Sequence, residues 1–207
     1  MMQALKARLD GHFVACSAVA AVAAVGGVAN TAEAGIVYSG VVNLPIAATT
    51  NGLYLNVVTG AINEPGNTGG ASVPGWDINP WGSTTLNFFN PAAPAGGVYA
   101  ATAGVVNKYV GGEIVGPANT WGTTNTNWNP APQSGYIGFR FQNEANGNQI
   151  HYGWAQIVTT STTSRTLVAY AYEDVAGGTI TVGAVPTPGS LALLAVGAAG
   201  LVGRRRR

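Results

Sequence analysis

Few side chains in this chain of 207 residues could carry out acid-base or nucleophilic chemistry. Of its two histidines, only His151 lies beyond the apolar N-terminal segment. A Ser-His-Asp triad would need that imidazole beside a hydroxyl such as Ser134 and a carboxylate such as Asp77 or Asp174. The stretch Gln133-Ser134-Gly135 lacks the Gly-x-Ser-x-Gly pattern that exposes a nucleophilic serine. We therefore assign no catalytic residue, and a hydrolase with an unrecognised site stays an alternative.

Paired carboxylates and metal ligands are equally sparse. Glu173 and Asp174 are adjacent at the end of an expected strand, where consecutive side chains point to opposite faces. Charge balance with Arg140 or Arg165 explains this pair better than glycosidase chemistry, which needs two carboxyl groups flanking one bond. The stretch Asp77-Ile78-Asn79 lacks the acidic density of a calcium loop. One histidine and no cysteine between the terminal segments exclude an ordinary zinc site, so no metal and no cofactor are expected.

Tryptophans offer a candidate binding site instead. Four of the five fall in loop-like stretches, 62–83 and 120–134, that are rich in Gly, Asn, Pro and Thr. They are Trp76, Trp81, Trp121 and Trp128. Aromatic rings beside amides and hydroxyls can stack on sugar faces and hydrogen-bond sugar hydroxyls, so a carbohydrate-binding module is a hypothesis. The interpretation that we favour is that these rings anchor long loops onto the sheets.

The N-terminus has the composition of a secretory signal peptide. Lys6 and Arg8 form a basic start, and an apolar stretch rich in Ala and Val follows at 13–28. Ala32 and Ala34 then form an A-x-A cleavage site, which leaves Gly35 as the first residue of the mature chain. We expect residues 1–34 to be removed by signal peptidase.

The C-terminus has three parts that act in sequence. A proline-rich break consists of Val185, Pro186, Thr187, Pro188 and Gly189. An apolar run at 191–202 follows, and the chain ends in Arg204, Arg205, Arg206 and Arg207. Prolines stop the preceding fold, and arginines stay on the cytoplasmic side of a membrane. A helix over 189–203 would span about 22 Å, less than the bilayer core of about 30 Å, which favours transient insertion.

From Val185 to Arg207 this tail resembles the PEP-CTERM sorting signal of bacterial envelope proteins, with Thr187 where the family usually has glutamate. Residues 135–185, including Gly-Tyr-Ile-Gly-Phe-Arg-Phe and His-Tyr-Gly-Trp-Ala-Gln-Ile, are similar to the recurrent C-terminal region of such surface proteins. The resemblance implies processing by an exosortase-like enzyme and delivery to the cell surface or an exopolysaccharide matrix. A short C-terminal membrane anchor is the alternative.

Charge excludes a nucleic-acid partner. Residues 35–184 contain three cations, Lys108, Arg140 and Arg165, against six carboxylates, giving a net charge of −3. Nucleic-acid binding needs a basic patch, and none is present in this region. The same region has no cysteine, so an exported domain would depend on its core and on backbone hydrogen bonds.

Composition and periodicity predict one all-β domain over 35–184, an antiparallel β-sandwich of jelly-roll-like form. A signal helix in 1–34 and a hydrophobic sorting helix in 185–207 would flank it. Short strand-like runs bounded by Gly, Asn and Pro indicate the first strands. These are Gly35–Asn43, Gly52–Val58, Thr84–Phe89 and Val98–Tyr109, the last with two short strands.

The C-terminal half predicts an antiparallel meander of four strands. Apolar Ile137, Phe139 and Phe141 alternate with other residues, a period of two that indicates one oily strand face. Asn146-Gly147 is the expected turn after that strand, and Val168, Tyr170 and Tyr172 should share a face in the third. The four expected strands are Tyr136–Gln142, Gln149–Val158, Thr166–Glu173 and Thr179–Val182.

Three function classes follow from these observations. The first is a non-catalytic exported surface or extracellular-matrix protein, sorted through a PEP-CTERM/exosortase-type pathway and associated with exopolysaccharide. The second is a carbohydrate-binding module that uses the loop tryptophans, and the third is the hydrolase. A structure that isolates His151 on a strand face would argue against the third.

Overall fold

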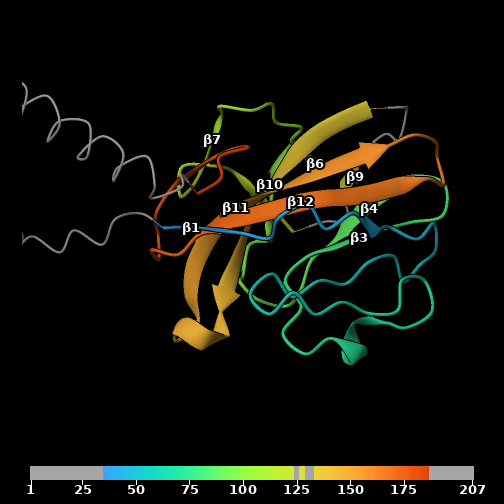
Figure 1. Ribbon diagram of the computed structural model, residues 1–207, viewed down its shortest axis with the longest axis horizontal. Coiled ribbons are helices and arrows are strands. Elements are labelled where there is room, and N and C mark those ends of the chain that lie inside the picture. The colour runs from blue at the N-terminus through green and yellow to red at the C-terminus, as the bar shows by residue number, and fades with distance from the viewer. Residues whose placement is uncertain (1–34, 124–125, 129–132, 187–207) are drawn as a thin grey trace, which may run out of the picture. The chain divides into compact units, whose positions relative to one another are not determined.

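The computed structural model describes residues 35–123, 126–128 and 133–186, and all of them belong to one unit of the chain (Figure 1). Apart from two short 3-10 turns, Gly70–Ser72 (η1) and Glu144–Asn146 (η2), the regular elements of these residues are β-strands. Every strand pair is antiparallel, which confirms the predicted all-β antiparallel class. The predicted signal and sorting helices lie outside the described residues.

The largest sheet follows the order β1-β12-β11-β10-β5-β6, and β2 and β8 pair with β12 and β5. Its strands are Ile36–Tyr38 (β1), Leu44–Pro45 (β2), Tyr99–Thr102 (β5), Val105–Val106 (β6), Trp121–Gly122 (β8), Gln133–Asn143 (β10), Gln149–Thr159 (β11) and Arg165–Glu173 (β12). The three long strands β10, β11 and β12 confirm the first three strands of the predicted meander. Alternating apolar residues and short turns are what build them.

The turn between β10 and β11 forms where the sequence predicts it. Asn143 accepts a hydrogen bond from the Ala145 amide, 3.0 Å, and this begins the turn η2. Gly147 then has a left-handed φ of 61°, which glycine adopts without steric cost. The turn therefore fixes the register in which Phe141 faces His151.

The predicted pairing of the fourth strand of the meander is wrong. Ile180–Thr181 (β13) pairs with Ile114–Val115 (β7) in a separate two-stranded sheet, and it does not pair with β12. β1 and β2, which come from the start of the domain, pair instead with the edge of β12 that faces away from β11. Pairing with a distant segment has no local signal, so the sequence favoured the nearest neighbour.

The sequence predicted that Val168, Tyr170 and Tyr172 share one face of their strand, and this is wrong for Val168. Opposite β11, Gln156 pairs with Ala169 whereas Ile157 pairs with Leu167, so Val168 is an extra residue in a bulge. A bulge shifts the two-residue period by one. Tyr170 and Tyr172 therefore face one hydrophobic cluster while Val168 packs against the other.

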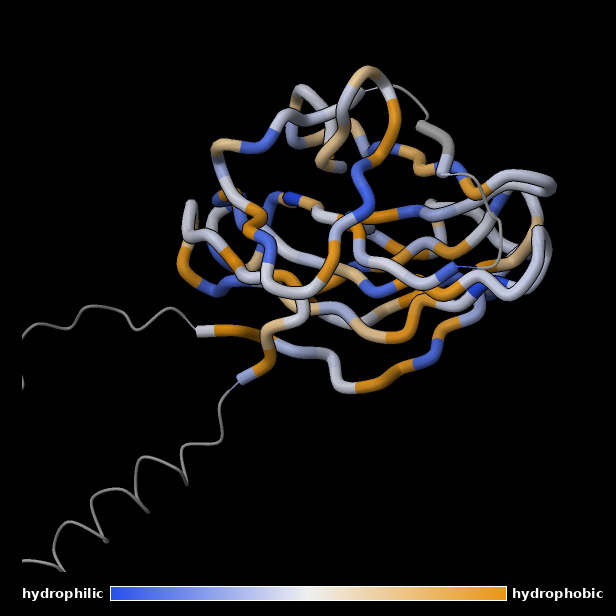
Figure 2. Tube along the Cα trace, turned by 90° about the horizontal axis from the view of Figure 1, so that it is seen from above, coloured by the Kyte–Doolittle hydropathy of each residue, from blue (hydrophilic) through white to orange (hydrophobic). Residues whose placement is uncertain are grey.

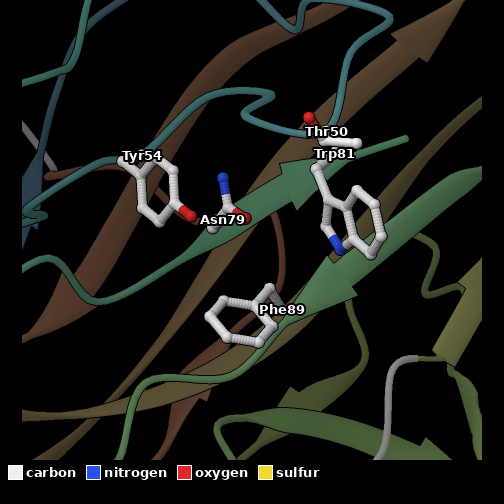
Figure 3. Close-up of a pocket in the computed structure, with 5 residues that line it drawn as sticks. All are labelled: Thr50, Tyr54, Asn79, Trp81 and Phe89. Atoms are coloured by element: carbon white, nitrogen blue, oxygen red, sulfur yellow. The ribbon is translucent and has the colours of Figure 1, made fainter. Parts of the chain in front are cut away.

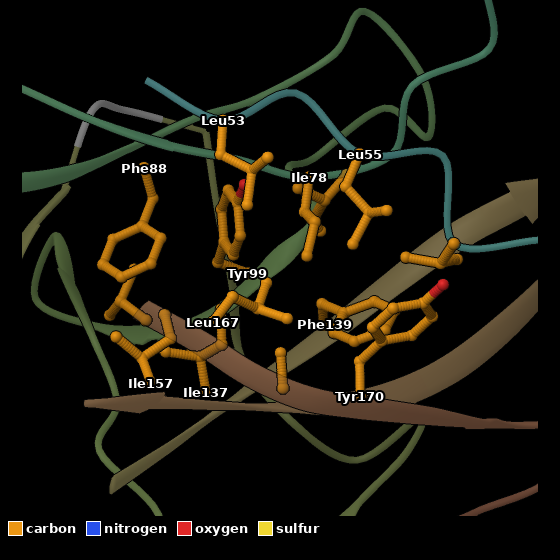
Figure 4. Packing of buried hydrophobic residues seen from close by; sticks show 14 of the residues in the cluster. Leu53, Leu55, Ile78, Phe88, Tyr99, Ile137, Phe139, Ile157, Leu167 and Tyr170 are labelled. Carbon is orange, nitrogen blue, oxygen red and sulfur yellow. The ribbon is translucent and has the colours of Figure 1, made fainter. Parts of the chain in front are cut away.

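Two hydrophobic clusters cover the two faces of the largest sheet. The larger joins it to a three-stranded sheet, Asn79–Trp81 (β3), Leu86–Phe89 (β4) and Thr126–Trp128 (β9). Figure 4 shows Leu53, Leu55 and Ile78 directed toward Phe139 and the side chains beside it. The smaller cluster includes residues of β7 and β13. Figure 2 shows hydrophobic and hydrophilic residues interspersed along the trace of the domain.

The first half of the domain matches the sequence less closely. Thr84–Phe89 contains β4, and Val98–Tyr109 contains the two short strands β5 and β6, as predicted. Gly52–Val58 was expected to be a strand but forms isolated bridges at Leu55. Conversely, the stretches expected to be loops contain β3, β8 and β9. Strands of two or three residues are too short to show a period.

Candidate functional site

The hairpin of β3 and β4 presents an amide and two aromatic rings on one face. Asn79 lies opposite Phe89 in the pairing, and Trp81 follows two residues later on the same strand. Side chains two residues apart share a face, so these three point away from the core. The intervening residues, Pro80 and Phe88, are buried on the other face.

A neighbouring loop turns this face into a cavity. The Leu53 amide donates to the Pro80 carbonyl, 3.0 Å, which holds the loop against β3. Leu53 enters the core, whereas the half-buried Tyr54 points the opposite way. The resulting cavity has a volume of about 300 Å³. Figure 3 shows the residues that line it, which are Thr50, Tyr54, Asn79, Trp81 and Phe89.

Two residues that line this cavity each have a buried polar atom without a hydrogen-bond partner. Asn79 is 1% exposed, and its Nδ2 donates to the Asn51 carbonyl, 3.0 Å, so the remaining amide atom is the acceptor Oδ1. That Oδ1 is buried and unpaired, as is the indole Nε1 of Trp81. Among the described residues, the other buried atoms without a partner are Trp154 Nε1 and Arg165 Nε. The residues that carry two of these four atoms, Asn79 and Trp81, therefore line the same cavity.

Such atoms are costly and require an explanation. A buried donor or acceptor without a partner destabilises a fold by about 1–3 kcal/mol, and most buried polar groups are satisfied. Asn79 and Trp81 are complementary, since the first offers an acceptor and the second a donor. A ligand that supplies both partners would recover this free energy on binding.

Trp76 extends the aromatic surface beyond the cavity. Its ring stacks on Phe89, with centroids 5.7 Å apart and planes at 19°, and meets Tyr54 edge-on at 4.9 Å. Gly70 lies so close that a methyl group there would be 2.7 Å from the Trp76 Nε1. Two of the four tryptophans singled out in the sequence are thus near each other. Trp81 lines the cavity, and Trp76 contacts two other rings that line it.

The other two tryptophans lie elsewhere and pack. Trp128, on β9, is 5% exposed within the larger cluster, with Lys108 Nζ 5.8 Å from its ring centroid. Trp121, on β8, packs against the smaller cluster on the other face of the main sheet. It meets Tyr152 at 5.6 Å, and the Arg140 guanidinium lies 4.9 Å from its ring centroid. These positions fit the role of anchors that hold short strands onto the sheet.

A second cavity, of about 220 Å³, lies beside Trp76 and contains two carboxylates. Its lining residues are Gly75, Trp76, Asp77, Pro91, Ala93, Gln142 and Glu144. Asp77 Oδ2 accepts a hydrogen bond from the Val57 amide, 2.8 Å. Burial, with a smaller contribution from the charge of Glu144, raises the pKa of Asp77 to about 7.

This pKa makes stability depend on pH. The raised pKa in the folded state gives stabilisation that is complete below about pH 4 and is lost as the pH rises through about 7. Asp77→Asn keeps an oxygen for the Val57 amide and cannot ionise. Wild type should lose a few kcal/mol of unfolding free energy across this pH range, at about 1.4 kcal/mol per pKa unit. We expect thermal melts of Asp77→Asn to show no such loss. Glu64→Gln, at an exposed carboxylate, is the control, and equal pH dependence in wild type and Asp77→Asn would contradict the assignment.

The triad considered in the sequence does not assemble. His151 is fully buried between Phe141 and Tyr172, with ring centroids 5.7 and 6.2 Å away. Its Nδ1 lies 2.7 Å from the Glu173 carbonyl, so that nitrogen is the donor. Neither of the two cavities is lined by His151 or by Ser134. The histidine is a buried structural residue of the sheet.

The carboxylates at the end of β12 bind backbone groups. Glu173 accepts from the Val175 amide, 3.1 Å, and Asp174 Oδ1 accepts from the Gly35 amide, 2.9 Å. The Asp174 amide in turn donates to the Gly35 carbonyl, 2.9 Å. A methyl group on Gly35 would lie 2.5 Å from Asp174 Oδ2, so a larger residue there would force this carboxylate to shift.

The predicted charge balance of this pair with arginine is therefore not what the structure shows. Arg140 donates to the carbonyls of Ala95 and Gly97, and Arg165 donates to those of Gly82 and Thr162. Within the part of the chain that the structure describes, no three His, Cys, Asp or Glu side chains gather as metal ligands.

Sequence reasoning found Trp76 and Trp81 but missed their partners. Tyr54, Asn79 and Phe89 come from three separate segments. The signal that was available is the alternation of Asn79 with Ile78 and Pro80, which marks a strand with a polar residue on its outer face.

Comparisons of the chain with protein families, with curated proteins and with solved structures found no match in any of the three. The chemistry of the cavity and the terminal sequences are therefore the features that indicate a function.

Proposed function

We propose that this protein is a non-catalytic exported surface or extracellular-matrix protein whose β-domain binds carbohydrate in the cavity between β3, β4 and the loop of Thr50 and Tyr54. One observation carries the binding proposal. An unpaired acceptor, Asn79 Oδ1, and an unpaired donor, Trp81 Nε1, belong to residues that line one cavity together with the rings of Tyr54 and Phe89.

Sugars have the complementary chemistry. A pyranose presents apolar C–H faces that stack on rings and an edge of hydroxyls that both donate and accept hydrogen bonds. The volume of about 300 Å³ lies at the lower end for small-molecule sites and suits a single sugar ring of a longer chain. Phe89, 42% exposed, and the half-buried Trp76 give an adjoining surface on which the next sugar would rest.

The charges favour a neutral or basic glycan. Neither cavity is lined by a lysine or an arginine, and Asp77 and Glu144 line the second. Glu144, together with the ionised fraction of Asp77, would repel uronic acids and phosphates at a distance of a few ångströms. The same charges support the sequence prediction that nucleic acid is not a partner.

Both ends of the described domain support export. Signal peptidase cleavage before Gly35 would turn its amide nitrogen into an ammonium group, and the hydrogen bond to Asp174 would become an ion pair. Val185 is 47% exposed and Pro186 is also exposed, so the start of the PEP-CTERM-like motif is open to an exosortase-like enzyme. Thr187 to Arg207 lie outside the described residues. Nowhere in the described ranges does a helix reach the length and apolarity required to cross a membrane.

The proposal includes the predicted arrangement of the sheets as a jelly-roll-like β-sandwich. The larger hydrophobic cluster takes residues from the main sheet and from β4 and β9 of the three-stranded sheet, and this supports a sandwich of jelly-roll-like form. Such a frame holds loops at its ends while the sheets stay rigid.

A hydrolase is the second candidate, for one reason. Asp77 and Glu144 line a cavity beside Trp76, and a carboxyl group with a raised pKa is what a general acid needs. The Val57 amide occupies Asp77 Oδ2, however, and this gives the carboxylate a structural role as well. We favour binding without turnover.

Intact-mass spectrometry of the protein from its native envelope and medium tests the export half of the proposal. We expect a chain that begins at Gly35 and lacks the residues from Leu191 to Arg207, with any added mass reporting what replaces the tail. A chain that retains its terminal arginines would contradict exosortase-type processing and would indicate a membrane anchor.

A further inference from the structure

We infer that the sugar held in this cavity carries an acetamido group, so that the ligand is an N-acetylhexosamine polymer. This inference depends on the carbohydrate-binding function proposed above. Its basis is the pairing of Asn79 Oδ1 with Trp81 Nε1, one free acceptor and one free donor on the same strand face.

An acetamido group matches these two atoms in kind. Its N–H would donate to Asn79 Oδ1, and its carbonyl oxygen would accept from Trp81 Nε1. The orientation of the Asn79 amide is fixed, because the Nδ2 hydrogen bond to the Asn51 carbonyl leaves only the oxygen for the cavity.

Spacing also favours an amide over a hydroxyl. Residues two apart on a strand are separated by about 6.5 Å along the backbone. A single hydroxyl would have to place both partners within about 3 Å of one oxygen. An amide has its donor and acceptor on different atoms that point in opposite directions, so it bridges two separated side chains more readily.

The aromatic walls suit the acetamido methyl group. Tyr54 and Phe89 both line the cavity, and both contact the Trp76 ring, so they form one continuous apolar surface. A methyl group placed there is removed from water. A hydroxyl or an ammonium group at the same sugar carbon gains nothing from these rings.

Binding requires a small movement of one ring. Neither unpaired atom is in contact with solvent. We assign this movement to Phe89, which lines the cavity, is 42% exposed and is the last residue of β4, and its ring would have to leave its stack on Trp76. Asn79, by contrast, is held through its Nδ2 and through its backbone amide, which donates to the Tyr99 hydroxyl at 2.7 Å.

Three β-1,4-linked tetrasaccharides with the same backbone test the inference: those of N-acetylglucosamine, glucosamine and glucose. Titration calorimetry on the folded domain should give an affinity for the N-acetylated chain roughly tenfold or more above the other two, as one or two hydrogen bonds provide. Equal affinities, or tighter binding of the glucosamine chain at the Asp77 carboxylate, would overturn the inference and leave carbohydrate binding intact. Binding of none of the three would overturn both.

Trp81→Phe tests the donor itself. Phenylalanine keeps an aromatic ring on β3 but lacks the indole N–H, so preference for the N-acetylated chain should fall about tenfold while the melting temperature changes little. Trp121→Phe is the matched control on the other face of the main sheet, and its preference should equal that of wild type. Full preference in Trp81→Phe would contradict the assigned hydrogen bond.

Discussion

Trp81→Ala is expected to lower the affinity of the domain for the N-acetylated tetrasaccharide at least about a hundredfold, the effect of losing a central aromatic contact. The substitution removes one wall of the cavity and one of its two unpaired polar atoms. The fold should survive, because Trp81 is half-buried on the outer face of β3 and is not part of either hydrophobic cluster. Calorimetry gives the affinity, and a thermal melt shows that the variant is folded.

Trp121→Ala is the control for this loss. Its indole contacts Tyr152 and Arg140 on the other face of the main sheet, so the variant should bind like wild type if it folds. Unchanged affinity in Trp81→Ala, or an equal loss in both variants, would contradict the placement of the site.

Trp128→Ala is expected to destabilise the domain by about 3–5 kcal/mol, the range for deleting a large buried aromatic side chain. Trp128 is 5% exposed and its ring lies 6.3 Å from that of Phe88, between the main sheet and the three-stranded sheet. The variant leaves a cavity that strands β4 and β9 cannot easily close. Denaturant unfolding of wild type and variant measures the difference in the free energy of unfolding.

The comparison of Trp81→Ala with Trp128→Ala separates two roles that the sequence left together. A variant of Trp128 that is still folded should bind the tetrasaccharide as wild type does, because its ring does not line the cavity. A similar loss of stability in both variants, without a specific loss of affinity, would favour the interpretation that both rings are packing anchors.

The sequence predicts the C-terminal strands well because their signal is local. Ile137, Phe139 and Phe141 alternate along β10, and Gly147 supplies the left-handed turn to β11. Each of these features acts within a few residues, and the long hairpin then fixes its own register. The antiparallel pairing of these strands follows from the same pattern, whereas the full burial of His151 does not.

Other features depend on contacts between distant segments. β13 pairs with β7 and not with β12, because β1 and β2 already pair with the edge of β12 that it would need. The bulge at Val168 changes the face of a residue without any unusual residue type to mark it. Strands as short as β8 obtain their stability from the sheet that they join.

The candidate site likewise combines a feature that the local sequence indicates with contacts between distant segments that it does not. Composition indicated tryptophans next to amides, and Trp81 with Asn79 fits that expectation. Their convergence with Tyr54 and Phe89 follows from the loop held against β3, which no periodicity reveals. Asp77 and Glu144 are also far apart in the sequence and meet at one cavity because β10 ends beside Trp76.

Proton-nitrogen correlation spectra of the indole groups during titration with the N-acetylated tetrasaccharide test the central claim most directly. The account predicts that the Trp81 Nε1–H signal, identified by its absence in Trp81→Phe, moves as a new hydrogen bond forms, while that of the buried and equally unpaired Trp154 stays in place. A shift confined to Trp121, or saturation without any movement of the Trp81 signal, would contradict binding in this cavity.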